Sequence, residues 1–143
     1  MHRYMLASFL IALPSAVHAQ SLLLNDIKAQ NGIQLPVDGL KQLMPGAKVL
    51  SRAETGSTRL WTNEPGGKLT ASSDNKASKG RGGSTSAQGT WHVGDNGTYC
   101  VTLEWARSSE NWCRYMFKVG AKYYGVSSAT NGAAKAHEFE ISK

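Results

Sequence analysis

Few residues of this chain could do chemistry as a group. His92 and Asp95 lie close enough in sequence for a histidine–aspartate pair or two metal ligands, but a catalytic or metal site needs a third partner that the sequence does not supply. Glu104 and Glu110 could pair as the carboxylates of a glycosidase, yet nothing in the sequence fixes their separation. We therefore predict a protein that is not an enzyme and holds no metal and no cofactor.

The aromatic residues are the better candidates for binding. An indole or phenol ring offers an apolar face and a polar edge, so it can line a ligand cavity or stack on a sugar. Core packing is the competing role, and it suits most of these rings. The candidates lie in or near expected strands: Trp61, Trp91, Trp105, Trp112, Tyr123 and Tyr124.

A basic segment provides a second kind of candidate. Residues 72–88 contain almost no apolar side chains and carry Lys76, Lys79 and Arg81, which could contact an anionic surface. A solvated exposed loop is the competing interpretation. The whole chain has a formal net charge of +6. We expect anionic envelope polymers, lipid headgroups or acidic proteins as partners, and no nucleic acid if the protein is exported.

The N-terminus is typical of an exported protein. Arg3 precedes an apolar stretch at 6–13 and the small-residue sequence Val17-His18-Ala19, which together predict a secretory signal peptide over residues 1–19. A lead segment at 20–36 and one β-rich domain at 37–143 follow. No stretch is long enough for a transmembrane anchor. We expect a periplasmic or extracellular protein.

Two cysteines fit that location. Cys100 and Cys113 are the only cysteines, and an even number in an exported chain indicates a disulfide. Their spacing places them on consecutive strands of one hairpin. Closing such a ring stabilises a fold by roughly 3 kcal/mol.

The elements that must position these residues are mostly strands. Residues 37–44 show helical spacing and end at Pro45-Gly46, and 21–31 could form a short helix or an extended arm. Turn signals then separate about seven strands, which we place at 57–63, 68–72, 89–93, 98–105, 112–119, 122–127 and 137–141. A meander of this kind predicts a mainly β fold, either a curved sheet or a small up-and-down, lipocalin-like barrel, with a β-sandwich as the alternative.

The central hairpin contains a conflict. Tyr99 and Val101 lie on the face opposite to Cys100, whereas Cys113 shares its face with the apolar Tyr115. If the cysteines face each other, the two apolar faces do not coincide. Either a bulge near Asn111 or a sheet covered on both sides would reconcile them.

One set of motifs resembles a known family. The residues are Leu40-Lys41-Gln42-Leu43, Pro45-Gly46, Gly56, Trp61, the Pro65-Gly66-Gly67 turn, Gly89-Thr90-Trp91, Cys100, Trp112-Cys113 and Tyr123-Tyr124. Over roughly residues 37–127 they resemble the small exported bacterial proteins grouped as domain of unknown function 995. The resemblance implies an exported β domain with one disulfide and no assigned activity.

Together these features predict a non-enzymatic protein that binds an envelope or extracellular component. A lipocalin-like carrier of a small apolar ligand is the first alternative and a hydrolase the second.

Overall fold

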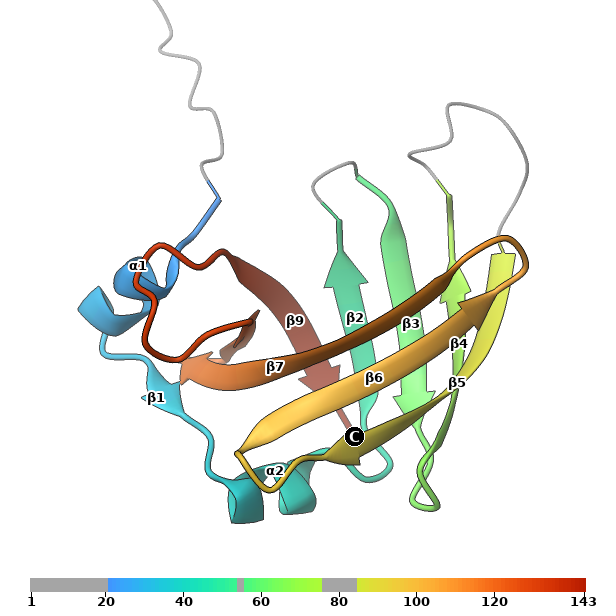
Figure 1. Ribbon diagram of the computed structural model, residues 1–143, viewed down its shortest axis with the longest axis horizontal. Helices are drawn as coiled ribbons and strands as arrows, with labels where there is room; N and C mark the ends of the chain where they lie inside the picture. The colour runs from blue at the N-terminus through green and yellow to red at the C-terminus, as the bar shows by residue number, and fades with distance from the viewer. Residues whose placement is uncertain (1–20, 54–55, 76–84) are drawn as a thin grey trace, which may run out of the picture.

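The protein is mainly β and forms an antiparallel barrel (Figure 1). The computed structural model describes residues 21–53, 56–75 and 85–143. The predicted signal peptide at 1–19 and the basic candidates Lys76, Lys79 and Arg81 lie outside these residues. In chain order the elements are α1 (Leu24–Ala29), β1 (Ile33–Gln34), α2 (Val37–Leu43), β2 (Lys48–Arg52), β3 (Thr58–Asn63), β4 (Lys68–Ser73), β5 (Thr85–Val93), β6 (Thr98–Trp105), β7 (Ser109–Val119), β8 (Lys122–Val126) and β9 (Ala136–Ser142).

Strands β2 to β9 form a closed meander. Each pairs antiparallel with the next, and β9 returns to pair with β2. The short β1 adds to β7, with Ile33 opposite Lys118. Each strand of the eight-stranded wall is paired on both sides over at least part of its length, which is the usual advantage of a barrel over an open sheet. The predicted up-and-down barrel is therefore confirmed in preference to the sandwich.

Glycine-containing turns join several strands. Gly67 and Gly97 are the last residues of the β3–β4 and β5–β6 turns, with φ of 91° and 82°, a region that residues with a side chain rarely adopt. The sequence predicted both hairpins from these residues. Each turn brings its strands back at the same end of the barrel as α2 (Figure 1).

The strand predictions were incomplete in three places. The two-residue β1 was not predicted. Lys48–Arg52 forms β2, which was not predicted because its short polar-ended pattern gives little signal. Residues 72–88 were expected to be one exposed loop. Instead Ser72 and Ser73 pair with Ser86 and Thr85, because backbone pairing continues the hairpin while the outward side chains stay in water.

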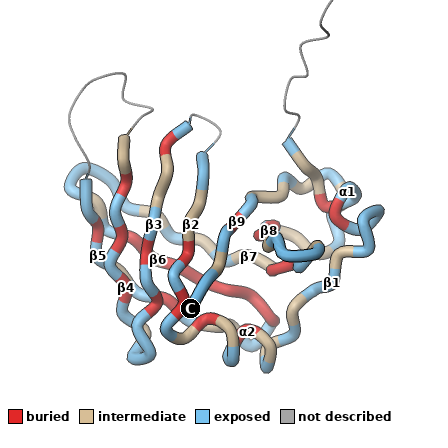
Figure 2. The backbone as a smooth tube through the Cα atoms, turned by 180° about the vertical axis from the view of Figure 1, so that it is seen from behind, coloured by how far each residue is buried: buried red, intermediate tan, exposed pale blue. Residues whose placement is uncertain are grey.

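The main core fills the barrel on the side of α2. Leu40 of α2 and Met44, the residue that follows α2, are fully buried and close that end. The inward side chains of Val49, Trp61 and Leu103 belong to the same core. Buried positions alternate with exposed ones along β4 and along the second half of β3 (Figure 2). This alternation is the expected pattern of strands with one face toward a core.

The disulfide settles the register of the central hairpin. Cys100 and Cys113 are bonded and lie directly opposite each other. Pairing of β6 with β7 continues without a bulge from Glu104 opposite Ser109 to Thr98 opposite Tyr115. Both cysteines therefore face outward, and Trp112 faces into the barrel beside Val101.

A second, smaller core covers the outward apolar face of β7. Phe117 and Tyr124 pack outside the barrel against Leu24 and Ile27, which are one turn apart on α1 and fully buried. The carboxylate of Asp26 accepts a hydrogen bond of 2.8 Å from the backbone N–H of Leu23 and so caps this helix. The sheet is thus covered on both sides here, which was one of the two expected solutions, and residues 21–31 include a short helix.

Candidate cation–aromatic cluster inside the barrel

An ion pair lies inside the barrel at the end opposite α2. Arg59 is near the start of β3 and Glu110 is near the start of β7. Nη1 of Arg59 donates to Oε1 and Oε2 of Glu110 at 2.6 and 2.5 Å. Nε1 of Trp105 donates to Oε2 of the same carboxylate at 2.6 Å, and the guanidinium of Arg59 lies 5.2 Å from the centre of the Trp105 ring. Glu110 is thereby held by two donors.

Arg114 is a second cation on the same face of β7. Its guanidinium carbon lies 4.3 Å from the ring centre of Trp112 and 5.6 Å from that of Phe139. Within residues 21–53, 56–75 and 85–143, this guanidinium has no hydrogen bond and no ion pair. Burial lowers the pKa of Arg114 to about 10, and the negative charge of Glu110 opposes that shift.

Gly125 leaves the space that the Arg114 side chain occupies. A Cβ atom at position 125 would lie 3.0 Å from Cδ of Arg114 and 2.6 Å from the ring of Phe139. Contacts of this length would force both side chains to move. Because position 125 of β8 has no side chain, Arg114 can lie across the inner wall of the barrel there.

The charges of this cluster do not balance. We define the cation–aromatic cluster as Arg59, Trp105, Glu110, Trp112 and Arg114. It contains two guanidinium groups and one carboxylate, and the carboxylate is bound by Arg59. Nε of Arg59 is also buried without a hydrogen-bond partner. One positive charge and several N–H donors are therefore left to interact with an anion or with water.

A separate hydrogen-bond network lies deeper in the barrel. The indole of Trp61 donates to the hydroxyl of Tyr99 at 3.0 Å, and that hydroxyl donates to Oδ1 of Asn63 at 2.6 Å. Burial raises the pKa of Tyr99 to about 12, because the apolar surroundings disfavour the phenolate. Both polar neighbours are themselves buried, so this network satisfies core groups and serves a structural role.

Aromatic rings fill the middle of the barrel. The ring centre of Trp112 lies 6.2 Å from that of Trp61, 5.9 Å from that of Tyr99 and 6.1 Å from that of Phe139. These are ordinary distances for packed rings. A carrier would need that volume for its ligand, so these contacts give the predicted apolar-ligand carrier no support.

The aromatic candidates separate into three groups. Trp61 and Trp91 are buried, and the indole of Trp91 donates to the backbone carbonyl of Glu64 at 2.8 Å. Trp105 and Trp112 belong to the cation–aromatic cluster. Tyr123 packs against the main core and Tyr124 against the second core, on opposite faces of β8. The structure thus places three of the six beside cations: Trp105, Trp112, and Tyr123, whose ring centre lies 5.6 Å from Nζ of Lys118.

The residues considered for catalysis do not assemble. His92 is exposed on the outer face of β5, opposite Cys100, and Asp95 lies in the following turn. Glu104 is exposed and faces outward, whereas Glu110 faces the interior opposite Leu103. Among the described residues no three His, Cys, Asp or Glu side chains group as a metal site would require, and no helix is long and apolar enough to cross a membrane.

Sequence reasoning missed Arg59 and Arg114. The signal that could have found Arg114 is the disulfide itself. Once Cys100 and Cys113 are placed opposite each other, Trp112, Arg114 and Met116 must face inward with Tyr99. For Arg59 the corresponding signal is its position two residues before the buried Trp61.

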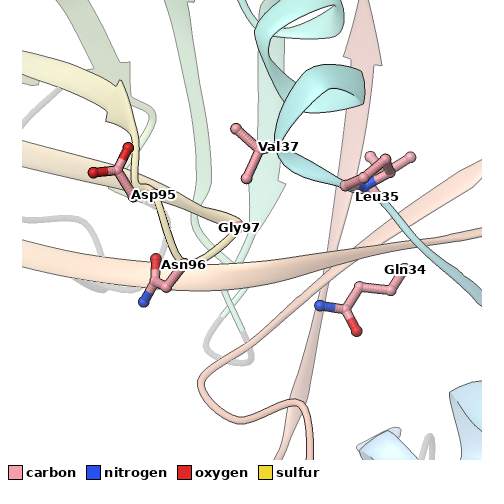
Figure 3. Close-up of a pocket in the computed structure, with 7 residues that line it drawn as sticks. Gln34, Leu35, Val37, Asp95, Asn96 and Gly97 are labelled. Atoms are coloured by element: carbon pink, nitrogen blue, oxygen red, sulfur yellow. The ribbon is translucent and has the colours of Figure 1, made fainter.

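A cleft on the outside of the barrel includes no residue of the cation–aromatic cluster. It has a volume of about 480 Å³ and lies between Gln34–Val37 and the β5–β6 turn (Figure 3). Its polar side chains, Gln34, Asp95 and Asn96, are exposed. It offers no charge arrangement comparable to that of the cation–aromatic cluster.

The fold and cluster define a small meander barrel with an unbalanced positive charge on its inner wall. Residues 8–114, about three quarters of the chain, match the family described as "Protein of unknown function (DUF995)". The chain therefore belongs to this family, as the sequence motifs suggested. No curated protein and no solved structure matches it significantly.

Proposed function

We propose that this protein is exported and acts as a non-enzymatic binding domain for an anionic component of the cell envelope or the surrounding medium. One observation carries the proposal: the guanidinium of Arg114 is half-buried among aromatic rings without a counter-ion or hydrogen-bond partner in the described chain. Buried charges in proteins are usually paired, because taking a charge out of water is costly. An anionic ligand would complete this pairing.

Three further features support the proposal. The chain has a formal net charge of +6, which favours encounter with anions. The disulfide between Cys100 and Cys113 suits an oxidising compartment. The pattern of residues 1–19 is that of a signal peptide.

The binding test compares anionic probes with and without Arg114. Vesicles of phosphatidylglycerol and phosphatidylcholine represent the envelope, and polyglutamate represents an acidic protein. We expect binding of at least one anionic probe, weakening as salt rises from roughly 0.05 to 0.5 M because the ion pairs are screened. The variant Arg114→Gln should bind several-fold more weakly than the wild type.

The matched control is Arg107→Gln. Arg107 is an exposed arginine in the β6–β7 loop near the same end of the barrel. The variant Arg107→Gln removes one positive charge, as Arg114→Gln does, and should leave the binding of anionic probes nearly unchanged. If both variants lose the same affinity for the anionic probes, the loss is an effect of net charge alone, and the proposed site at Arg114 is contradicted.

Export has its own test. The intact mass of the protein recovered from outside the cytoplasm should match a chain that begins at Gln20 with its two cysteines oxidised. Recovery of the full chain from the cytoplasm in reduced form would contradict this part of the proposal.

A further inference from the structure

We infer that the cation–aromatic cluster binds a planar monocarboxylate, with its carboxylate on Arg114 and its apolar body against the ring of Trp112. This inference rests on the proposed function, because it specifies the anion that the same site would take. The net charge of the cluster, the planar shape of the guanidinium and the access to Arg114 each restrict which anion can bind.

Charge favours one negative charge. Glu110 already neutralises Arg59 through two oxygen atoms, so the cluster keeps a single uncompensated positive charge. A monoanion would balance Arg114. A phosphate monoester would bring about two negative charges close to Glu110, and that like-charge contact is unfavourable.

Shape favours a planar group. A carboxylate bound to both arms of a guanidinium lies in the plane of that guanidinium. The guanidinium of Arg114 lies at stacking distance over Trp112, 4.3 Å from the ring centre. A flat body attached to that carboxylate would lie beside the guanidinium and pack against the exposed edge of the Trp112 ring, next to the face that Arg114 covers. A tetrahedral phosphate cannot place its substituent in that plane.

Access comes from the edge of β7. On the side of β8, pairing with β7 begins only at Tyr115 opposite Val126. The preceding residues of β7, including Trp112 and Arg114, have a described strand neighbour only on the β6 side. Both side chains remain partly exposed. A small molecule can approach them past the end of β8 without displacing the buried rings.

The test uses benzoate as the probe, with the oxidised wild-type protein. Acetate has the charge without the flat body, benzyl alcohol has the ring without the charge, and inorganic phosphate has the wrong shape. Isothermal titration calorimetry measures the affinities and tryptophan fluorescence reports on the ring beside Arg114. We expect benzoate to bind more tightly than each of the other three small molecules.

Two variants at position 114 separate charge from shape. Arg114→Gln should weaken benzoate binding by about 10- to 100-fold, the usual effect of removing a charged hydrogen-bond donor. Arg114→Lys keeps the charge but loses the planar fork, so it should also bind benzoate at least several-fold more weakly. Arg107→Gln should bind like the wild type. Circular dichroism establishes that each variant is folded.

The outcomes distinguish the inference from the proposed function. Tight benzoate binding that depends on Arg114 supports both. The planar-carboxylate inference is wrong, and the anion-binding function stands, in either of two cases. In the first, polyglutamate, phosphate or anionic vesicles bind through Arg114 while benzoate does not. In the second, Arg114→Lys binds benzoate as well as the wild type. If Arg114→Gln changes the binding of no anionic probe, both are wrong.

Discussion

Replacing Arg114 by methionine should stabilise the fold while removing the proposed anion site. Burial lowers the pKa of Arg114 to about 10, because the rings around the guanidinium take the place of water. A decrease of this size from the ordinary value of an arginine corresponds to roughly 3 kcal/mol, at about 1.4 kcal/mol per unit of pKa. The side chain is half-buried, so water screens part of this cost, and about half of it is a reasonable share.

Two contributions decide the net change. The contact of the guanidinium with Trp112 contributes about 0.5–1 kcal/mol, which the variant loses. Methionine is unbranched and keeps the packing of the arginine stem beside Gly125. We therefore expect the free energy of unfolding at pH 7 to rise by about 0.5–1 kcal/mol. The folded state binds this proton more weakly than the unfolded state, so the penalty is complete at pH 7 and disappears only as pH rises through about 10 and above.

The assay is equilibrium unfolding in urea, followed by tryptophan fluorescence, on the oxidised protein. Arg107→Met is the matched control, since it makes the same exchange at an exposed position and should change stability by less than about 0.5 kcal/mol. A loss of about 1 kcal/mol or more in Arg114→Met would refute the reasoning. Arg114 would then be a structural part of the core, and the lack of an ion-pair partner among the described residues would no longer indicate a ligand.

Two further substitutions test the fold itself. Gly89→Ala should lose more than about 2 kcal/mol of stability in the same urea assay, because its Cβ would meet the backbone oxygen of Thr102. The control Gly66→Ala, with open space around position 66, should lose far less. Equal losses in the two variants would contradict the close packing of β5 on β6. Tyr99→Phe should lose about 1–3 kcal/mol, since it leaves Asn63 without its buried donor, and should remove an absorbance transition near pH 12. The raised pKa of Tyr99 means that this stabilisation is complete below about pH 10 and is lost as pH rises toward 12, so a wild-type protein equally stable at both would count against it.

Much of the barrel could be predicted because its signals are local. The turns at Gly67 and Gly97 depend on residues that permit positive φ, and consecutive hairpins determine a meander. Strand β2 and the polar end of the β4–β5 hairpin escaped prediction. Their strands are held by backbone pairing to neighbours rather than by an apolar pattern of their own, and a neighbour is not visible in a local window.

The candidate site was only partly predictable for a different reason. Trp105 and Trp112 were identified as binding candidates by residue type. Arg114 was not, because the apolar run of Tyr115, Phe117 and Val119 suggested that this face of β7 was the buried one. That face is indeed covered, but by α1 on the outside of the barrel, and a helix formed far away in sequence cannot be placed from the pattern of a strand.

The disulfide connects these observations. Bonding of Cys100 to Cys113 requires the two residues to lie on the same face, and their outward position forces Trp112 and Arg114 inward. The apolar face displaced to the outside then needs a cover, which Leu24 and Ile27 of α1 provide. The outer face of β7 already supplies apolar side chains to the second core, and the inward Arg114 adds a charge rather than an apolar side chain to the main core. Among the residues that the structure describes, its half-buried guanidinium has no ion pair and no hydrogen bond, which packing alone does not explain, so this is the position at which a ligand should first be sought.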